Sequence, residues 1–291
     1  FFLVHPTIFL QKFTDDFNNL AENKYSSVSI AIIDLDKDSV LADVNGEKTL
    51  MCASTAKLFS TFSALEILGV DYKPKTSIYT NGKVDSDGVL KGDLIIRGGG
   101  DVTLGSKYFN DENLEYGFMS MWMDSLRELG ICSIEGDIIS DGSDFGYVGV
   151  PDGWDWSDMG NYYGAGASGI NFYDNTVKYY FDTPSTGKKV KFKGTFPMDS
   201  MLKFSHTIKS ANIRNDQSYL FGAPYSQDRF GIGSLPSNRN DFVVKGSMHD
   251  PEYMLAKEFF DFLRDSNLNV IGTALGYRLL NRPKIVYDSL N

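Results

Sequence analysis

The sequence changes character near residue 76, and this change limits the folds open to the chain more than any other feature. Before it, the pattern predicts a helix over 7–23, a hairpin with strands at 27–34 and 40–44, and a helix over 54–68. After it, short strand-like runs alternate at close intervals with turns rich in Gly, Asn and Asp. Such runs occupy 77–80, 94–97, 138–140, 176–181 and 190–192. The pattern is typical of an α+β protein with a β-rich insertion.

Two further helices are expected after this change. The first lies near 112–129 and interrupts the short strands. The second opens at Asp250-Pro251-Glu252, where Asp suits the N-cap and Pro suits the first turn, and it runs to about Asp265. A strand near 269–273 follows it. The chain therefore returns to helical structure after the β-rich stretch.

Charge and cysteine content exclude several classes of function. With 28 basic and 38 acidic residues the net charge is −10, and no basic run is present, so nucleic acid is not an expected partner. The two cysteines, Cys52 and Cys132, have no second Cys at metal-ligand spacing, which excludes a disulfide scaffold, a zinc ribbon and an iron–sulfur cluster. We expect no cofactor and no metal.

The first ten residues allow two interpretations. Residues 1–10 are apolar but contain His5 and Pro6, and residue 1 is not Met. They could be the remnant of an export or anchor segment, or an arm that packs on the body of the protein. No apolar run in the sequence approaches the roughly 20 residues that span a bilayer.

Ser54-Thr-Ala-Lys57 is the strongest candidate for chemistry. Positions i and i+3 share a helix face, so Lys57 lies one turn beyond Ser54, where an amine can take the proton of a serine nucleophile. Lysine side chains are protonated at pH 7, so this role requires burial or a second cation nearby. The helix over 54–68 is apolar nearly all round, and we expect it to be mostly buried.

The four residues alone are weak evidence. About one chance match is expected in a chain of this length, and a second copy, Ser185-Thr-Gly-Lys188, stands in a Pro/Gly turn that cannot form a helical pair. On the motif alone, a helix N-cap at Ser54 followed by a surface lysine is the favoured interpretation.

The surrounding sequence favours the catalytic interpretation. Ser-x-x-Lys is the nucleophile motif of penicillin-binding proteins. In order along the chain, the sequence resembles the D-alanyl-D-alanine carboxypeptidase/endopeptidase family of low-molecular-mass penicillin-binding proteins (peptidase family S13). The matching stretches are 52–59, Leu68-Gly69, 88–101, Thr103-Leu104, 136–145, Gly153-Trp154, 161–165 and His249-Asp-Pro251.

The resemblance implies a split architecture. Residues 1–75 and 249–291 would be parts of a penicillin-binding, transpeptidase-like domain, and residues 76–248 would be the β-rich inserted part. It also implies that Ser54 is the nucleophile and Lys57 the base, with a peptidoglycan stem peptide or a β-lactam as ligand and a location outside the cytoplasm.

Two motifs of the family are not found in the expected place, beyond the return helix. Ser210-Ala-Asn212 has the letters of Ser-x-Asn but falls in the insertion, and Ser289-Leu-Asn291 is treated as coincidence. Lys245-Gly-Ser247 resembles Lys-Thr-Gly only loosely and precedes the return helix. The simplest interpretation is that the catalytic domain continues beyond Asn291, and that a partner chain or a C-terminal segment covers the open edge of the first hairpin.

Two functions therefore stay open. One is a serine D-Ala-D-Ala carboxypeptidase or endopeptidase that works through an acyl-enzyme. The other is a non-catalytic relative or fragment that serves as a structural or binding component of an assembly.

Other candidates are weaker. The three histidines, His5, His206 and His249, lack a nucleophile motif beside them, and His249 is expected at a helix entry. Gly98-Gly-Gly-Asp101 lacks the Lys-Ser/Thr of a phosphate loop and predicts a tight turn. Asp152, Asp155 and Asp158, around Trp154 and Trp156, fit no EF-hand spacing and indicate a solvated acidic loop with packed indoles.

Overall fold

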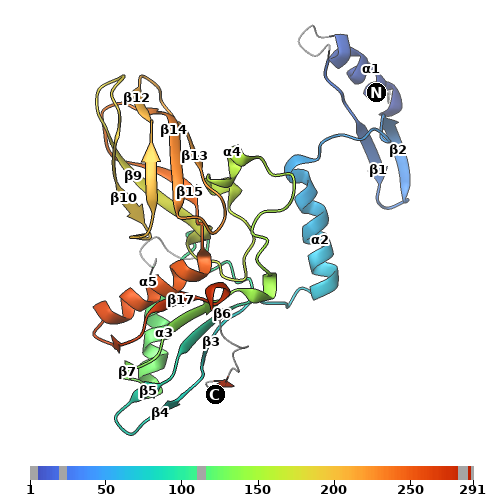
Figure 1. Cartoon of the computed structure of the whole chain (residues 1–291). Coiled ribbons are helices and arrows are strands. Elements are labelled where there is room, and N and C mark those ends of the chain that lie inside the picture. Colours follow the sequence, from blue (N-terminus) through green and yellow to red (C-terminus); the bar gives the residue numbers. More distant parts are fainter. Residues whose placement is uncertain (1–5, 20–24, 110–115, 281–287, 290–291) are drawn as a thin grey trace. The chain divides into compact units, whose positions relative to one another are not determined.

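A computed structural model describes residues 6–19, 25–109, 116–280 and 288–289 (Figure 1). Its contacts divide the chain into two units, Phe1–Tyr72 and Lys73–Asn291. Helices and several sheets occur together, so the expected α+β class is confirmed. Among the described residues, no helix combines the length and the apolar content that a membrane span requires.

The first unit contains two helices and one hairpin. The helices are α1 (Pro6–Asn19) and α2 (Ala56–Leu68), and the antiparallel strands are β1 (Ile30–Asp34) and β2 (Ser39–Val44). Asp34 Oδ1 accepts hydrogen bonds from the backbone N–H groups of Asp36 and Lys37, which closes the turn between the strands. Among the described residues of this unit, the buried apolar ones are Leu10, Ala42 and Val44, so α1 packs on β2.

The second unit is built first on a five-stranded sheet. Its strand order is β17 (Ala274–Gly276), β8 (Ile138–Asp141), β6 (Leu94–Gly98), β3 (Thr76–Thr80) and β18 (Asp288–Ser289). The helix α5 (Pro251–Asp265) packs against β8 and β17. The helix α3 (Gly117–Glu128) contacts α5, as Figure 1 shows. The central strands bury Leu94, Ile95 and Ile96 of β6 and Ile138 and Ile139 of β8, as expected for a sheet covered by helices, and β8 also buries the polar residues Ser140 and Asp141.

Unit 2 also contains a smaller, four-stranded sheet. It has the order β16 (Asn269–Val270), β7 (Ser133–Ile134), β5 (Val89–Lys91) and β4 (Lys83–Val84). In both sheets a strand that follows α5 pairs in parallel with one that precedes the β-rich part. Residues about 136 positions apart are therefore neighbours.

Residues 176–247, called the β-rich part from here on, form two further sheets. One has the order β10 (Lys191–Phe196), β9 (Thr176–Thr183) and β15 (Arg239–Ser247). In the other, β14 (Asp228–Pro236) pairs with β11 (Lys203–His206), β12 (Lys209–Ala211) and β13 (Gln217–Phe221). Burial alternates along β9, and its buried residues Val177, Tyr179 and Phe181 face a core that Phe192 and Phe204 complete.

The domain boundaries expected from the sequence stay a prediction. The contacts place Lys73–Asn291 in one unit, so 249–280 pack with the inserted part. The α5 helix and the strand β17 are members of the layer that β6 and β8 build. A transpeptidase-like domain made jointly of 1–75 and 249–291 is an inference from the resemblance.

Candidate functional site

Ser54 lies in a short 3-10 turn at the start of α2. The turn spans Ala53–Thr55, and its backbone closes when Thr55 N–H donates to the carbonyl of Cys52 at 3.0 Å. Ala53 has φ of +44°, a left-handed conformation that costs free energy for a residue with a Cβ atom. The chain therefore enters α2 through a tight bend, and Ser54 stands at the helix N-terminus, where the dipole favours negative charge.

Lys57 lies one turn further along and reaches back to Ser54. Its Nζ donates a hydrogen bond to Ser54 Oγ at 2.9 Å. This contact agrees with the i, i+3 prediction and falls in the range in which a base takes a proton from a nucleophile. The structure brings the two predicted residues together, and their catalytic role stays a proposal.

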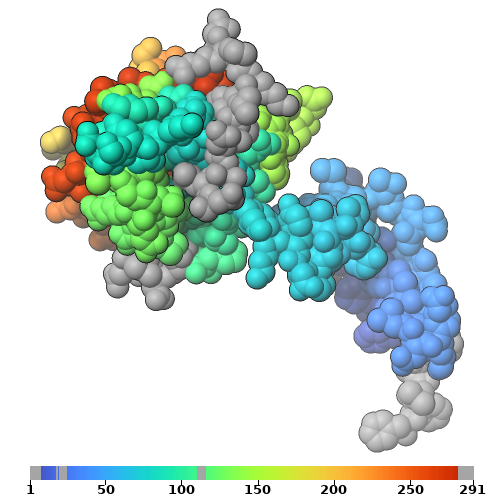
Figure 2. All heavy atoms as spheres, turned by 90° about the horizontal axis from the view of Figure 1, so that it is seen from below, coloured from blue at the N-terminus to red at the C-terminus, as the bar shows by residue number. Residues whose placement is uncertain are grey.

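The expected burial of α2 is wrong for the described chain. No residue of α2 is buried, and apolar side chains such as Leu58 and Ile67 are 72% and 80% exposed. Figure 2 shows the cyan spheres of α2 on the face that it draws. The physical reason is that unit 1 supplies only α1 and a two-stranded sheet, and these bury their own residues, not α2.

The pair can therefore do one part of a reaction. A serine hydroxyl 2.9 Å from an unprotonated amine can attack a carbonyl carbon: the amine takes the hydroxyl proton as the ester forms and can pass it to the leaving group. Among the described residues, the Lys57 ammonium donates to Ser54 Oγ and forms no ion pair.

The match to a family model decides the classification. A model of the D-Ala-D-Ala carboxypeptidase 3 (S13) family matches residues 10–275, which is most of the chain. This chain belongs to the S13 family. The family resemblance expected from the motifs is confirmed.

The S13 relatives found are longer than this chain. D-alanyl-D-alanine carboxypeptidase DacB of Haemophilus influenzae is 27% identical over 176 residues, which is 60% of this chain and 34% of that protein. The crystal structure of penicillin binding protein 4 (dacB) from H. influenzae has a TM-score of 0.67 at 20% identity, covering 93% of this chain and 57% of the other. A second structure of that protein, complexed with a novel β-lactam, has a TM-score of 0.60 at 19% identity, covering 91% and 55%. At these identities the structures show a shared fold.

The motif look-alikes belong to unit 2, whereas Ser54 belongs to unit 1. Ser210 is buried in β12, and Lys245 lies on β15 with Lys178 as its register partner on β9. Ser289 belongs to β18. Lys188 N–H donates to Ser185 O in a turn, as expected for the second Ser-x-x-Lys copy. All of these residues belong to unit 2.

The histidines serve the packing of unit 2. His206 stacks on Phe204, and burial together with Lys189 lowers the pKa of its imidazole. His249 is buried before α5, with its Nε2 3.5 Å from Asp199 Oδ2, and burial lowers its pKa. His5 lies outside the described residues.

The glycine turn agrees with the structural interpretation, whereas the packed indoles expected in the acidic loop are wrong, because Trp154 and Trp156 are 39% and 55% exposed. Gly100 has φ of +82° and its N–H donates to Gly169 O, while Asp101 Oδ1 accepts from the backbone and hydroxyl of Thr103. These contacts define a tight turn. No group of three metal-ligating side chains occurs in the described residues, the Asp152–Asp158 loop included.

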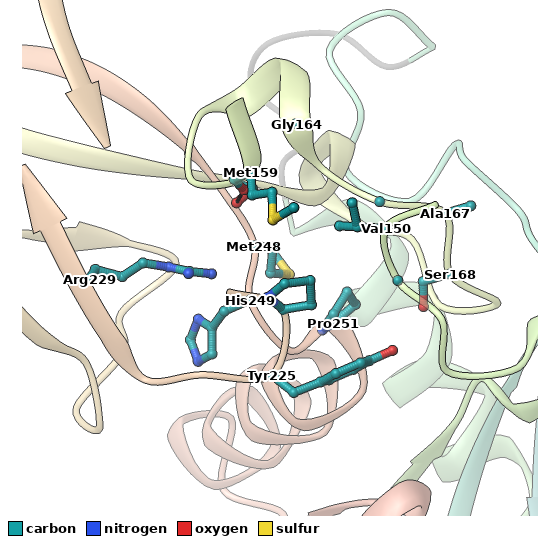
Figure 3. A pocket seen from close by; sticks show the side chains of 14 residues that line it. Val150, Met159, Gly164, Ala167, Ser168, Tyr225, Arg229, Met248, His249 and Pro251 are labelled. Atoms are coloured by element: carbon teal, nitrogen blue, oxygen red, sulfur yellow. Dashed lines mark hydrogen bonds between the residues drawn. The ribbon is translucent and has the colours of Figure 1, made fainter. Parts of the chain in front are cut away.

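A small cavity lies where the β-rich part meets α5 (Figure 3). Its volume is about 20 Å³, enough for about one water molecule, and its lining includes Arg229, Tyr225 and His249. Arg229 Nη1 donates to Ala223 O at 2.9 Å, and Tyr225 N–H donates to His249 O at 2.7 Å. The cavity is a packing feature, because no substrate of peptide size fits it.

Sequence reasoning missed a buried polar network around the start of α5. Asp250 Oδ1 caps the helix at Tyr253 N–H, and its Oδ2 pairs with Arg278 at 2.9 Å. Glu252 accepts from the N–H groups of Gly142 and Arg278 at 2.7 and 3.1 Å, and burial raises the pKa of its carboxyl group. The Asp-Pro-Glu sequence signalled the cap, but no local signal marks partners 26 and 110 positions away.

Proposed function

We propose that this chain carries the nucleophile and base of a serine D-Ala-D-Ala carboxypeptidase or endopeptidase that acts on peptidoglycan peptides. The observation that carries the proposal is the 2.9 Å hydrogen bond between Lys57 Nζ and Ser54 Oγ at the start of a helix in an S13-family chain. The proteins it resembles are named as carboxypeptidases, and one was crystallised with a β-lactam. The proposed place of action is outside the cytoplasm, where peptidoglycan lies.

The proposed chemistry proceeds through an acyl-enzyme. Ser54 Oγ attacks the carbonyl carbon of the D-Ala–D-Ala bond while the unprotonated amine of Lys57 takes the hydroxyl proton. The bond to the terminal D-alanine then breaks, and its amine leaves with that proton. Water attacks the resulting Ser54 ester, which releases the shortened peptide and restores the hydroxyl group.

The pair does not complete this reaction alone. The string Lys-Thr-Gly is absent from the sequence. In the family pattern its lysine would bind the substrate carboxylate, and its strand would supply an oxyanion-hole N–H, a donor whose loss costs roughly 10²–10³ in rate. We therefore propose that residues outside this sequence supply these groups and cover α2.

The experiment uses a fluorescent penicillin and an intact-mass measurement of the native polypeptide. We expect no covalent labelling of the 291-residue chain alone. We expect labelling at Ser54 in a longer native form with a mass above 32.5 kDa. In that form Ser54→Ala should abolish labelling, and Lys57→Ala should slow acylation about 10²–10⁴-fold. Labelling that persists in Ser54→Ala would refute the assignment.

The exposed helix α2 favours a second candidate. A chain that leaves this apolar helix uncovered and lacks Lys-Thr-Gly suits a non-catalytic component that docks on another chain. A native mass equal to 32.5 kDa, with no labelling in the presence of cell-wall partners, would support this candidate over the enzyme.

A further inference from the structure

A groove lies along the C-terminal half of α5, in unit 2. Its volume is about 750 Å³, within the range of roughly 300–1,000 Å³ typical of ligand sites. We name it the α5 groove, with an aromatic floor and a carboxylate rim formed by Tyr116, Phe196, Phe262, Glu258, Asp261 and Asp265. None of these residues belongs to the Ser54–Lys57 pair or to the buried network at the start of α5.

The floor of the groove is a group of three aromatic rings. Tyr116 stacks on Phe262 with centroids 6.4 Å apart and rings 17° from parallel, and it meets the edge of Phe196 at 6.0 Å. Tyr116 is 43% exposed, so part of this surface faces solvent. Aromatic faces bind apolar side chains and also attract cations.

The rim carries its carboxylates on one stripe of α5. Glu258, Asp261 and Asp265 are spaced i, i+3 and i+7, so they follow one another along the helix beside Phe262. A separate stripe of Leu255, Phe259 and Leu263 is fully buried in the core. The same helix therefore presents one stripe to the core and another to the groove.

Three carboxylates and one guanidinium, that of Arg264, line the groove, so its acidic groups outnumber its basic ones. Asp261 pairs with Lys257, and the guanidinium of Arg264 lies 5.5 Å from the ring of Phe260. Glu258 and Asp265 form no ion pair with any side chain in the described part of the chain. Burial, with Asp261 adding to it and Lys257 opposing it, raises the pKa of Glu258 to about 7. A cation bound here would offset the cost of ionising a half-buried carboxyl group.

We propose that the α5 groove binds a short peptide that presents a lysine side chain next to an aromatic one. The lysine ammonium lies at the carboxylate rim that Glu258 and Asp265 form, and the aromatic side chain packs on Tyr116 and Phe262. Charge complementarity selects the lysine, and the apolar floor selects its neighbour. This site is independent of the proposed peptidase activity.

The test titrates the full chain with acetyl-Phe-Lys-Phe-amide and follows backbone amide signals by NMR. We expect saturable binding, with shifts confined to residues around 116, 196 and 258–265. A peptide with norleucine in place of lysine has the same length without the charge, and it should bind at least about tenfold more weakly.

Paired variants separate the groove from general charge effects. Glu258→Gln with Asp265→Asn should weaken the lysine peptide about tenfold or more and leave the norleucine peptide unchanged. Asp124→Asn with Glu128→Gln removes the same charge from exposed positions of α3 and should change neither. The proposal is overturned by equal affinity for the two peptides, by shifts elsewhere in the chain, by an unaffected Glu258–Asp265 variant, or by no saturation.

Discussion

The two units of this chain divide stability and chemistry between them. Unit 2 has a continuous core that includes Leu94, Phe172, Tyr179 and Phe259, all essentially inaccessible to solvent. Among its described residues, unit 1 has three buried apolar residues, and it carries the Ser54–Lys57 pair at the start of α2. The large core and the candidate catalytic pair thus belong to different units. Substitutions in unit 2 should mainly change the free energy of unfolding, and substitutions at the pair in unit 1 should mainly change activity.

The largest expected effect is on the core of unit 2. Phe259 is fully buried in α5, so Phe259→Ala removes a large side chain and leaves a cavity. We expect a loss of about 3–5 kcal/mol in the free energy of unfolding, measured by urea titration. The matched control is Phe62→Ala in α2, where the side chain is 64% exposed and the change should stay within about 0.5 kcal/mol. Similar losses for the two would remove the contrast between the units.

The next effect concerns pH and Glu258. Its folded pKa of about 7 lies above the ordinary value of 4.5, so the folded state binds more protons than the unfolded state between these values. Stability from this group is present below about pH 4.5 and is lost as pH rises through 7. Glu258→Gln should therefore stabilise unit 2 at pH 8 by on the order of 2 kcal/mol and have little effect at pH 4.5. Thermal unfolding at the two pH values measures this, and an equal shift at both would contradict it.

A smaller and local effect is expected in unit 1. Leu10 is a buried residue of α1 that packs on β2. Leu10→Ala should therefore lower the free energy of unfolding of this packed pair by about 2 kcal/mol. Hydrogen exchange should show faster exchange at 30–44 with no change at 176–183. Faster exchange in both segments would mean that the units unfold together.

The smallest effect is expected at the candidate catalytic pair. Ser54 and Lys57 are exposed and hydrogen-bonded mainly to each other, so Ser54→Ala and Lys57→Ala should each change the free energy of unfolding by less than about 0.5 kcal/mol. Urea titration of both variants checks this. A large loss for either would give the pair a structural role instead.

Local patterns predicted the elements well because their causes are local. The Asp250-Pro251 start of α5, the alternating burial of β9 and the Ser54–Lys57 contact all follow from spacing within a few residues. The burial of α2 was predicted wrongly, since an apolar pattern records what a helix needs and cannot say which partner is present. The α5 groove could not be predicted, because Tyr116 and Phe262 are far apart in sequence and meet only through the fold.

The bonds between Gly160 and Ser247 have a consequence for how the chain folds. Ser247 N–H donates to Gly160 O at 3.0 Å, and Ser247 Oγ donates to Met159 O at 2.5 Å. These bonds hold the two ends of residues 160–247 together. The parallel pairing of β8 with β17 closes a loop of about 136 residues, and loop closure is slow and entropically costly when the intervening chain is unfolded. Once residues 160–247 have folded, their ends are adjacent, and the effective loop shrinks to the short segments on either side. Folding of residues 160–247 should therefore precede the pairing of β8 with β17, and misfolding of that segment should delay this pairing.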